Sequence, residues 1–321
     1  MNRRVRKYAI GTLLVTVLAA SSVKGQVNPA TAFYWENPYY INPAFVHTDA
    51  SAYFFLSARK QWMALSGSPV TFFGTATFYS ERYRMQTGVK ILHDKIGYVG
   101  SSDLSLSYAY SLELRNGALN MGLALSYQLQ AVDREKMAIE EENDPVLASL
   151  ADTKKGWNTG VGAEYIAGRS LRAGISAQNM LSFFKKGRNI FGGTNYLYGR
   201  YRTRILGRLY QPTAYRTTAS PTTYDMEWGI CLRQYENDFQ VDGVVSFYLN
   251  HHTQREKFQV SILGRSIGEI GVLTGVKLLS EVKVLCAYDY NFRAWQGNSR
   301  GTFEVIVSYS LLPKKCVADG F

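Results

Sequence analysis

The stretch that decides the fold is residues 37–78, which read NPYYINPAFVHTDASAYFFLSARKQWMALSGSPVTFFGTATF. Two Asn-Pro steps open it, at Asn37 and Asn42, and each proline lacks an amide donor and disfavours helix in the residue before it. We therefore expect an extended, irregular lead-in that then becomes a strand. A turn at 67–69 and a second strand that ends near Phe78 complete what the pattern predicts to be the first hairpin of an antiparallel sheet.

The first strand has two unlike faces, because successive side chains in a strand point to opposite sides. One face is apolar and the other is mostly polar. The apolar set is Ala52, Phe54, Leu56, Ala58 and Trp62, and the opposite set is Ser51, Tyr53, Ser57, Arg59 and Gln61.

The same alternation continues to the end of the chain. Between residues 104 and 114, leucine and tyrosine alternate with serine and alanine, and Asn116-Gly117 then supplies the positive φ angles of a tight turn. The span 207–223 fits poorly and holds either an extra strand or a long connection. Fourteen alternating segments are predicted, at residues 51–62, 71–77, 85–92, 104–114, 119–129, 157–167, 171–178, 195–206, 224–233, 239–250, 257–265, 269–279, 282–291 and 302–312.

The composition of the polar face indicates a membrane protein. This face consists mainly of Gly, Ser, Ala, Asn and Gln, whereas a soluble sandwich exposes Lys, Glu and Thr. The segments are close to the roughly 9–11 residues with which a tilted strand crosses a bilayer. We predict an all-β fold, a transmembrane antiparallel β-barrel of about 14 strands, and keep a secreted soluble β protein as the alternative. Aromatic residues expected to form interfacial girdles are Trp62, Tyr79, Tyr83, Trp157 and Tyr290.

The chain is predicted to have four segments. Residues 1–25 read as a secretory signal peptide, with a basic start and an apolar run too short for a spanning helix. Residues 26–50 form a periplasmic lead-in or plug, residues 51–312 the outer-membrane barrel, and residues 313–321 a C-terminal tail. An even number of strands places both termini in the periplasm. The tight turns at 116–117, 168–169 and 280–281 then lie on the periplasmic side, and the loops at 132–156, 179–193 and 292–300 lie outside.

Charge and motifs argue against several functions. Five of the 36 basic residues lie in the signal peptide, which leaves 31 basic against 25 acidic residues and no dense basic face for nucleic acid. Three cysteines without CxxC spacing predict neither a disulfide framework nor a zinc site. His251 and His252 are neighbours and would point to opposite faces of a strand. We expect no enzymatic activity, no cofactor and no metal.

Part of the opening stretch resembles a known family. The residues that carry the resemblance are Asn42, Pro43, Ala44, Arg59, Gln61, Trp62, Gly67 and Pro69. They are similar to the opening signature of the PorP/SprF family, outer-membrane proteins of Bacteroidetes tied to type IX secretion and gliding motility. The similarity continues through residues 94–97 and 288–290 and weakens between 180 and 221. His47 and Thr48 stand near where a glycine is common in the family.

This resemblance implies an accessory or scaffold barrel of type IX secretion, or of the export and presentation of a surface adhesin. The implied partners are outer-membrane lipid, periplasmic secretion or peptidoglycan-binding components, and a secreted adhesin. The alternative is an outer-membrane pore for small solutes. In that case the arginine-rich run 200–208 would favour anions if it faced the lumen.

Two groups of residues form the candidate functional site. Arg59 and Gln61 should face the lumen near the outer end of the first strand, where they either hold a plug or loop or pair with acidic lumen residues such as Glu113 or Glu164. Trp62 would face lipid. The second group is an aromatic patch that we expect at the periplasmic mouth, where it either plugs the barrel or docks a partner. The patch comprises Tyr34, Trp35, Tyr39, Tyr40 and Phe45.

Overall fold

The structure is a computed structural model that describes residues 31–133, 153–168, 170–184, 190–205, 223–235, 238–251, 254–292 and 300–311. The predicted signal peptide, most of the 132–156 loop, nearly all of the span 207–223 and the C-terminal tail lie outside these residues. Within the described part of the chain, no helix is long and apolar enough to cross a membrane.

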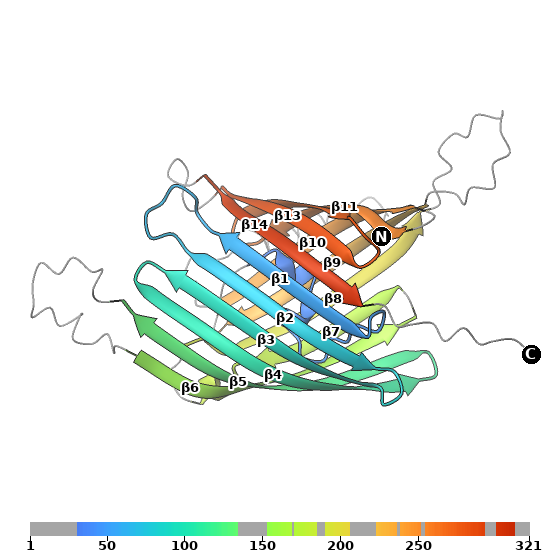
Figure 1. The fold of residues 1–321 in the computed structure, drawn as a ribbon, viewed down its shortest axis with the longest axis horizontal. Coiled ribbons are helices and arrows are strands. Elements are labelled where there is room, and N and C mark those ends of the chain that lie inside the picture. Colours follow the sequence, from blue (N-terminus) through green and yellow to red (C-terminus); the bar gives the residue numbers. More distant parts are fainter. Residues whose placement is uncertain are drawn as a thin grey trace, which may run out of the picture.

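The sheet closes on itself as an antiparallel barrel (Figure 1). Each strand pairs with its neighbours in the chain, and β1 (Ala52–Lys60) also pairs with β14 (Thr302–Leu311), with Ala52 opposite Leu311. The predicted barrel of about 14 strands is therefore confirmed. The other strands are β2 Val70–Ser80, β3 Met85–Ile96, β4 Val99–Leu114, β5 Gly117–Val132, β6 Thr153–Ala167, β7 Leu171–Gln178, β8 Thr194–Ile205, β9 Thr223–Tyr235, β10 Asp238–His251, β11 Gln254–Arg265, β12 Glu269–Lys277 and β13 Val282–Asn291.

The outer surface of the barrel is apolar and its lumen is polar. On β4, Leu104 and Leu106 are 49% and 60% exposed, whereas Ser105 between them is 2% exposed. The same alternation separates Leu56 from Ser57 on β1. A continuous outward belt of leucine and aromatic side chains suits lipid, and a closed ladder leaves no backbone groups unpaired there.

The strands differ in length, and the rim of the wall is uneven. We call the end where β1 begins and β14 ends the proximal end, and the opposite end the distal end. β4 and β5 have 16 residues each, but β7 has only 8. Because β6 pairs with β7 only over 161–167, the distal half of β6 extends beyond its neighbour.

The lead-in is more compact than the extended path expected from its prolines. It contains two 3₁₀ helices, η1 (Phe33–Trp35) and η2 (Pro38–Tyr40). Asn37 is non-helical, with φ −129° and ψ 80°, as a residue before proline should be. Pro38 then begins η2, because its fixed φ suits the first helical position.

One predicted strand end is wrong. β1 stops at Lys60, and Trp62 lies in the connection to β2 with a positive φ of 50° and a half-buried side chain. The chain leaves the ladder here because the Met63 amide donates to the Gly301 carbonyl at 2.8 Å, across the distal rim. Trp62 is therefore not a lipid-facing strand residue.

The outward belt predicts a depth-dependent cost for charge. Leu106→Lys, at the middle of β4, should lower the free energy of unfolding by about 2–4 kcal/mol, and Leu114→Lys, at its proximal end, by about 0–1 kcal/mol. Urea unfolding in lipid vesicles measures both values. Equal losses for the two variants would contradict the membrane placement of β4.

Candidate functional site: the occupied lumen

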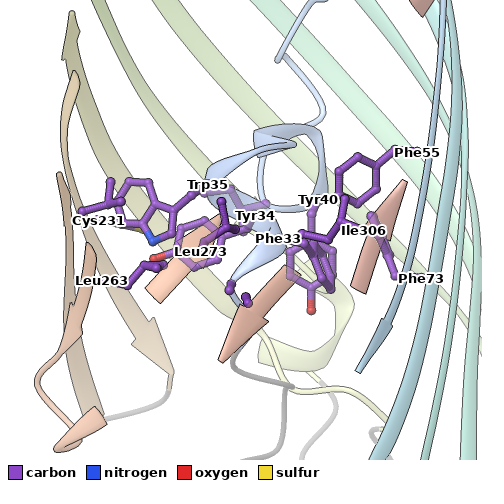
Figure 2. Close-up of a cluster of buried hydrophobic side chains, with 14 of the residues drawn as sticks. Phe33, Tyr34, Trp35, Tyr40, Phe55, Phe73, Cys231, Leu263, Leu273 and Ile306 are labelled. Atoms are coloured by element: carbon purple, nitrogen blue, oxygen red, sulfur yellow. The ribbon is translucent and has the colours of Figure 1, made fainter. Parts of the chain in front are cut away.

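The lead-in lies inside the barrel, deeper than the mouth where the aromatic patch was expected. We call residues 31–50 the plug; Phe33 is fully buried and Trp35 is 4% exposed (Figure 2). Polar groups of the plug contact strands all around the wall, which only a segment within the lumen can do. Ala32 N donates to Glu304 of β14 (3.0 Å), Tyr34 Oη to Asp242 of β10 (2.7 Å), Asn37 Nδ2 to Thr75 Oγ1 of β2 (3.0 Å), and His47 N to Gln86 Oε1 of β3 (2.9 Å), while Tyr39 Oη and Ser107 Oγ of β4 share a hydrogen bond (2.5 Å).

Aromatic stacking fixes the first turn of the plug. The Phe33 ring stacks on Phe73 of β2 with centroids 4.4 Å apart and meets Tyr40 edge-on at 4.8 Å. Phe55 of β1 lies 6.0 Å from the same ring. Each such pair is worth about 0.5–1.5 kcal/mol beyond the area it buries. The predicted aromatic patch is therefore packed against the wall and is not presented to solvent within the described structure.

The wall is shaped to receive the plug. A Cβ at Gly122 of β5 would lie 2.5 Å from the Pro43 carbonyl, and a Cβ at Gly229 of β9 would lie 2.5 Å from the Trp35 ring. At Gly199 of β8, by contrast, no atom lies within 4 Å of such a Cβ. Glycine at 122 and 229 thus permits the plug backbone and ring to approach the strands closely.

Asn42 of the Asn-Pro-Ala motif locks the plug to two strands. Its Nδ2 donates to the Ala163 carbonyl of β6 at 3.1 Å and to Tyr198 Oη of β8 at 3.2 Å. Its Oδ1 accepts from Ala44 N at 2.9 Å, which closes a local turn around Pro43. A fully buried amide requires this many partners, so the motif residues serve to anchor the plug.

Arg59 and Gln61 both face the lumen near the distal end and are nearly fully buried. Arg59 Nη1 donates to Gln61 Oε1 at 2.8 Å, and its guanidinium lies 3.7 Å from Glu304 and 3.9 Å from Asp289. Glu304 also accepts from Ala32 N of the plug. Arg59 was expected either to hold a plug or to pair with an acidic lumen residue. Both are true here, because Glu304 pairs with Arg59 and also accepts a hydrogen bond from the plug.

The carboxylates suggested as partners of Arg59 lie elsewhere. Glu113 pairs with Arg84 at 2.8 Å near the proximal end of β4, where both side chains are exposed. Glu164 faces the lumen but pairs with Arg172 at 3.4 Å. Arg59 lies directly opposite Glu304 in the β1–β14 ladder that closes the barrel. The sequence shows alternation along one strand but not the register of that closing pair, so this partner was not predicted.

Sequence reasoning also missed the rest of the distal charge network. Arg265 of β11 lies 2.7 Å from Glu269 of β12 and 3.1 Å from Asp289 of β13, and all three are buried. With Arg59 and Glu304, they join five strands, β1 and β11 to β14. Each sits at an inward position of its strand, which is the signal that could have found them. Because a buried charge is tolerated only when paired, the network holds these strands together around the plug.

The remaining motif residues shape the distal rim. Gly67 has φ +68°, which suits glycine, and its carbonyl accepts from Gly97 N at 2.9 Å. The Pro69 carbonyl accepts from Gln61 N at 2.9 Å. The first bond joins the β1–β2 connection to the β3–β4 turn, and the second closes the β1–β2 connection. Gly67 and Pro69 therefore stabilise the distal rim.

The arginine-rich run is neutralised. Arg200 pairs with Glu227, and Arg202 lies 3.1 Å from Asp225 and 2.5 Å from Glu256. The Arg208 position of this run lies outside the described residues. Arg200 and Arg202 face the lumen, which was the condition for an anion preference, but carboxylates cancel the charge that would attract anions. The plug also neutralises a basic side chain of the wall, because Glu36 pairs with Lys283 of β13 at 2.9 Å.

The connection between β7 and β8 also enters the lumen, from the distal side. Ile190 and Phe191 are buried, and the Phe191 carbonyl accepts from Ser182 Oγ at 3.0 Å. Asn179 is held by Gln128 of β5 at 2.7 Å. A cavity of about 30 Å³ separates Phe191 from Tyr40 of the plug, about enough room for one water. The plug and this connection together occupy the lumen from both ends.

His47 is a titratable group near the proximal end of the plug. Its ring stacks on Tyr53 of β1, with centroids 4.0 Å apart, and meets Phe45 edge-on. Burial, with the nearby Arg172 guanidinium of β7 as a second cause, lowers the pKa of His47 from 6.5 to about 3. Its Nε2 has no hydrogen-bond partner among the described residues. The seated plug therefore prefers a neutral His47.

The comparisons with known proteins find one family and several solved structures. A family model described as "Type IX secretion system membrane protein PorP/SprF" matches residues 22–309. A search of curated protein sequences finds no match. Among solved structures, the chain is similar to Omp33 from Acinetobacter baumannii (8% identity, TM-score 0.45, covering 82% of this chain and 100% of that one) and to the CymD monoaromatic hydrocarbon channel (11% identity, TM-score 0.42, covering 88% and 94%).

The close approach at Gly122 predicts that a side chain there unseats the plug. Gly122→Val should speed maleimide labelling of a Val46→Cys reporter by about tenfold or more, because overpacking costs about 1–3 kcal/mol. The reporter chain has its three native cysteines replaced. Gly199→Val, which meets open space, is the matched control and should leave the rate unchanged; equal rates for both variants would refute the seating at Gly122.

The lowered pKa of His47 predicts that acid loosens the plug. A released His47 has its ordinary pKa of 6.5 and a seated one a pKa of about 3, so the released state binds the extra proton between these values. Seating should weaken as pH falls below about 6.5. Channel events in planar bilayers should become more frequent over that range in the wild type, and His47→Phe should abolish the pH dependence. An identical pH profile for the variant would count against His47 as the sensor.

Proposed function

Because this chain belongs to the PorP/SprF family of type IX secretion system membrane proteins, we propose that it serves type IX secretion as a plugged outer-membrane scaffold. The observation that carries this proposal is the occupation of the lumen. The plug contacts opposite walls of the barrel, and Phe191 of the β7–β8 connection lies across a cavity of about 30 Å³ from Tyr40 on the distal side. A scaffold needs a stable wall and surfaces for partners, and it does not need an open path.

Solute passage would carry a high cost in this arrangement. It would require breaking buried contacts such as Tyr34 to Asp242 and Asn42 to Tyr198. Each buried polar group left unsatisfied costs about 1–3 kcal/mol. The neutralised arginines also remove the electrostatic attraction that would support an anion pore. A small-solute pore is therefore the weaker candidate, and we further propose that the chain works without catalysis.

The proposed partners follow from the two ends of the barrel. An even number of strands puts both ends of the barrel wall on one side, and we propose that this proximal side faces the periplasm, where peptidoglycan-binding or other secretion components would dock. The distal end faces the cell exterior, where a secreted surface adhesin would be exported or presented. Lipid covers the outward apolar belt between them. The signal peptide, residues 1–25, would direct the chain to this membrane and be removed.

A pull-down and a conductance measurement test this proposal. Crosslinking in intact outer membranes, with a tag after Phe321, should recover periplasmic peptidoglycan-binding proteins or one large surface protein. The purified wild-type barrel should show no steady conductance in planar bilayers at neutral pH. A variant that lacks residues 31–46 should conduct, provided its heat-modifiable gel mobility shows a folded barrel. Recovery of the barrel alone, together with steady wild-type conductance, would replace the scaffold with a pore.

A further inference from the structure

Among the described residues, the distal half of β6 lacks a strand partner on one side. β6 pairs with β5 as far as Thr153, but it pairs with β7 only from Val161 onward. The described start of the β7–β8 connection lies beside β6 at Asn158, whose side chain accepts from Leu181 N at 3.0 Å and donates to Ser182 Oγ at 2.9 Å. Its described residues form no strand pairing with 153–157. Over residues 153–157, β5 is the sole strand partner of β6 within the described chain. We call residues 153–157 the free edge.

The backbone donors of the free edge point away from β5. Thr159 N donates to the Asn158 side chain at 3.0 Å and thus lies on the side that faces away from β5. In an antiparallel ladder, N–H and C=O groups alternate between the two sides of a strand. Trp157, Lys155 and Thr153 therefore direct both groups toward the position that a longer β7 would occupy. Such a row is a template for an added strand.

A groove on the outer wall begins where the free edge ends. It has a volume of about 530 Å³, and Phe239 of β10 is among its lining residues. Its floor follows two cross-strand rows of outward side chains, starting at the last β6–β7 pairs. The rows are Val161–Ala177–Asn195–Gln234 and Ala163–Ile175–Leu197–Leu232. Ala177 and Asn195 are short and form a depression between Val161 and Phe239. A strand added along β6 would direct an outward side chain into this groove.

The surroundings define the chemistry of the added strand. Its outward side would meet Trp157, which is 62% exposed and packs edge-on against Tyr127 at 5.1 Å. Its inward side chains would lie next to Gly156. A Cβ built on Gly156 meets no atom within 4 Å, so this side of the added strand has room for small polar residues. Lys155 is exposed and Lys154 half-buried, so acidic residues would complement this rim.

We propose that the free edge and the adjoining groove form a docking site for an extended segment of a partner protein, which adds to the barrel as a strand beside β6. The segment alternates apolar residues with small polar ones and carries acidic residues opposite Lys155. This inference rests on the proposed function, because it supplies the surface by which the scaffold would hold a partner at the distal end. The main-chain bonds give affinity, and the groove selects the side chain.

A designed peptide tests the site directly. The probe is a fluorescent peptide about as long as the unpaired part of β6, alternating valine with serine and carrying two glutamates at the end that would meet Lys155. Its matched control has the same sequence with N-methyl groups on alternate residues, which removes the donors of one edge. Fluorescence anisotropy with the purified full chain in detergent should show saturable binding of the probe and none of the control.

Variants separate the edge from the groove. Lys155→Pro removes one edge donor, whereas Lys155→Ala removes only the charge; we expect about tenfold weaker binding for the first and a smaller loss for the second. Ala177→Trp fills the groove and should weaken binding by about tenfold, while Ala58→Trp on outward β1 should leave binding unchanged. Heat-modifiable mobility checks that each variant is folded. Equal binding by all variants, or by the N-methylated peptide, would overturn the proposal.

The same variants separate this inference from the proposed function. If the tagged wild type recovers a partner and Lys155→Pro recovers it equally, the partner uses another surface and only the docking inference falls. If the wild type recovers no partner, the scaffold role falls, and the peptide result alone decides the docking site. A mass increase of the purified wild type to two barrels, lost in Lys155→Pro, would show that a second copy pairs with the edge and would overturn a heterologous partner.

Discussion

The rest of the structure depends on the pairing of backbone groups where no water is present. An unpaired amide or carbonyl in lipid costs several kcal/mol, so a sheet can cross a membrane only as a closed ladder. The pairing of Ala52 with Leu311 completes that ladder. Closure then forces every second side chain inward, and a barrel of this width is too large for its own side chains to fill. The plug supplies the missing contents.

The lumen combines an aromatic centre with charged layers, and plug and wall are interdependent in both. Phe33 packs against aromatic residues of the wall, while Glu36 and the Ala32 amide complete ion pairs and hydrogen bonds that the wall begins. Buried charges require full pairing, so removing the plug would leave wall residues such as Glu304 and Lys283 short of partners. Plug and wall therefore form one core, and neither has all its hydrogen-bond and ion-pair partners without the other.

The uneven rim follows from the same need to fill the lumen. The connection after β7 turns inward and buries Phe191 next to the plug, so β7 does not continue to the distal rim of the wall. Strand edges are normally paired, covered or charged, since an open edge recruits other chains. Within the part of the chain that the structure describes, the edge of β6 has no strand partner at 153–157 and lies beside an apolar groove. Filling the lumen from the distal side therefore also creates a place on the outer wall where another chain can bind.

The sequence by itself determined the class of the fold, the approximate strand number, the inward position of Arg59 and Gln61, and the aromatic character of the lead-in. Periodicity, turns and composition are local properties, so they can be read from neighbouring residues. Only the tertiary structure decided that the lead-in lies in the lumen, that Arg59 meets Glu304 and not Glu113, and that β7 stops short of β6. These features depend on which strands closure brings side by side and in which register, and on how a separate segment fills the enclosed volume, and no local pattern encodes either.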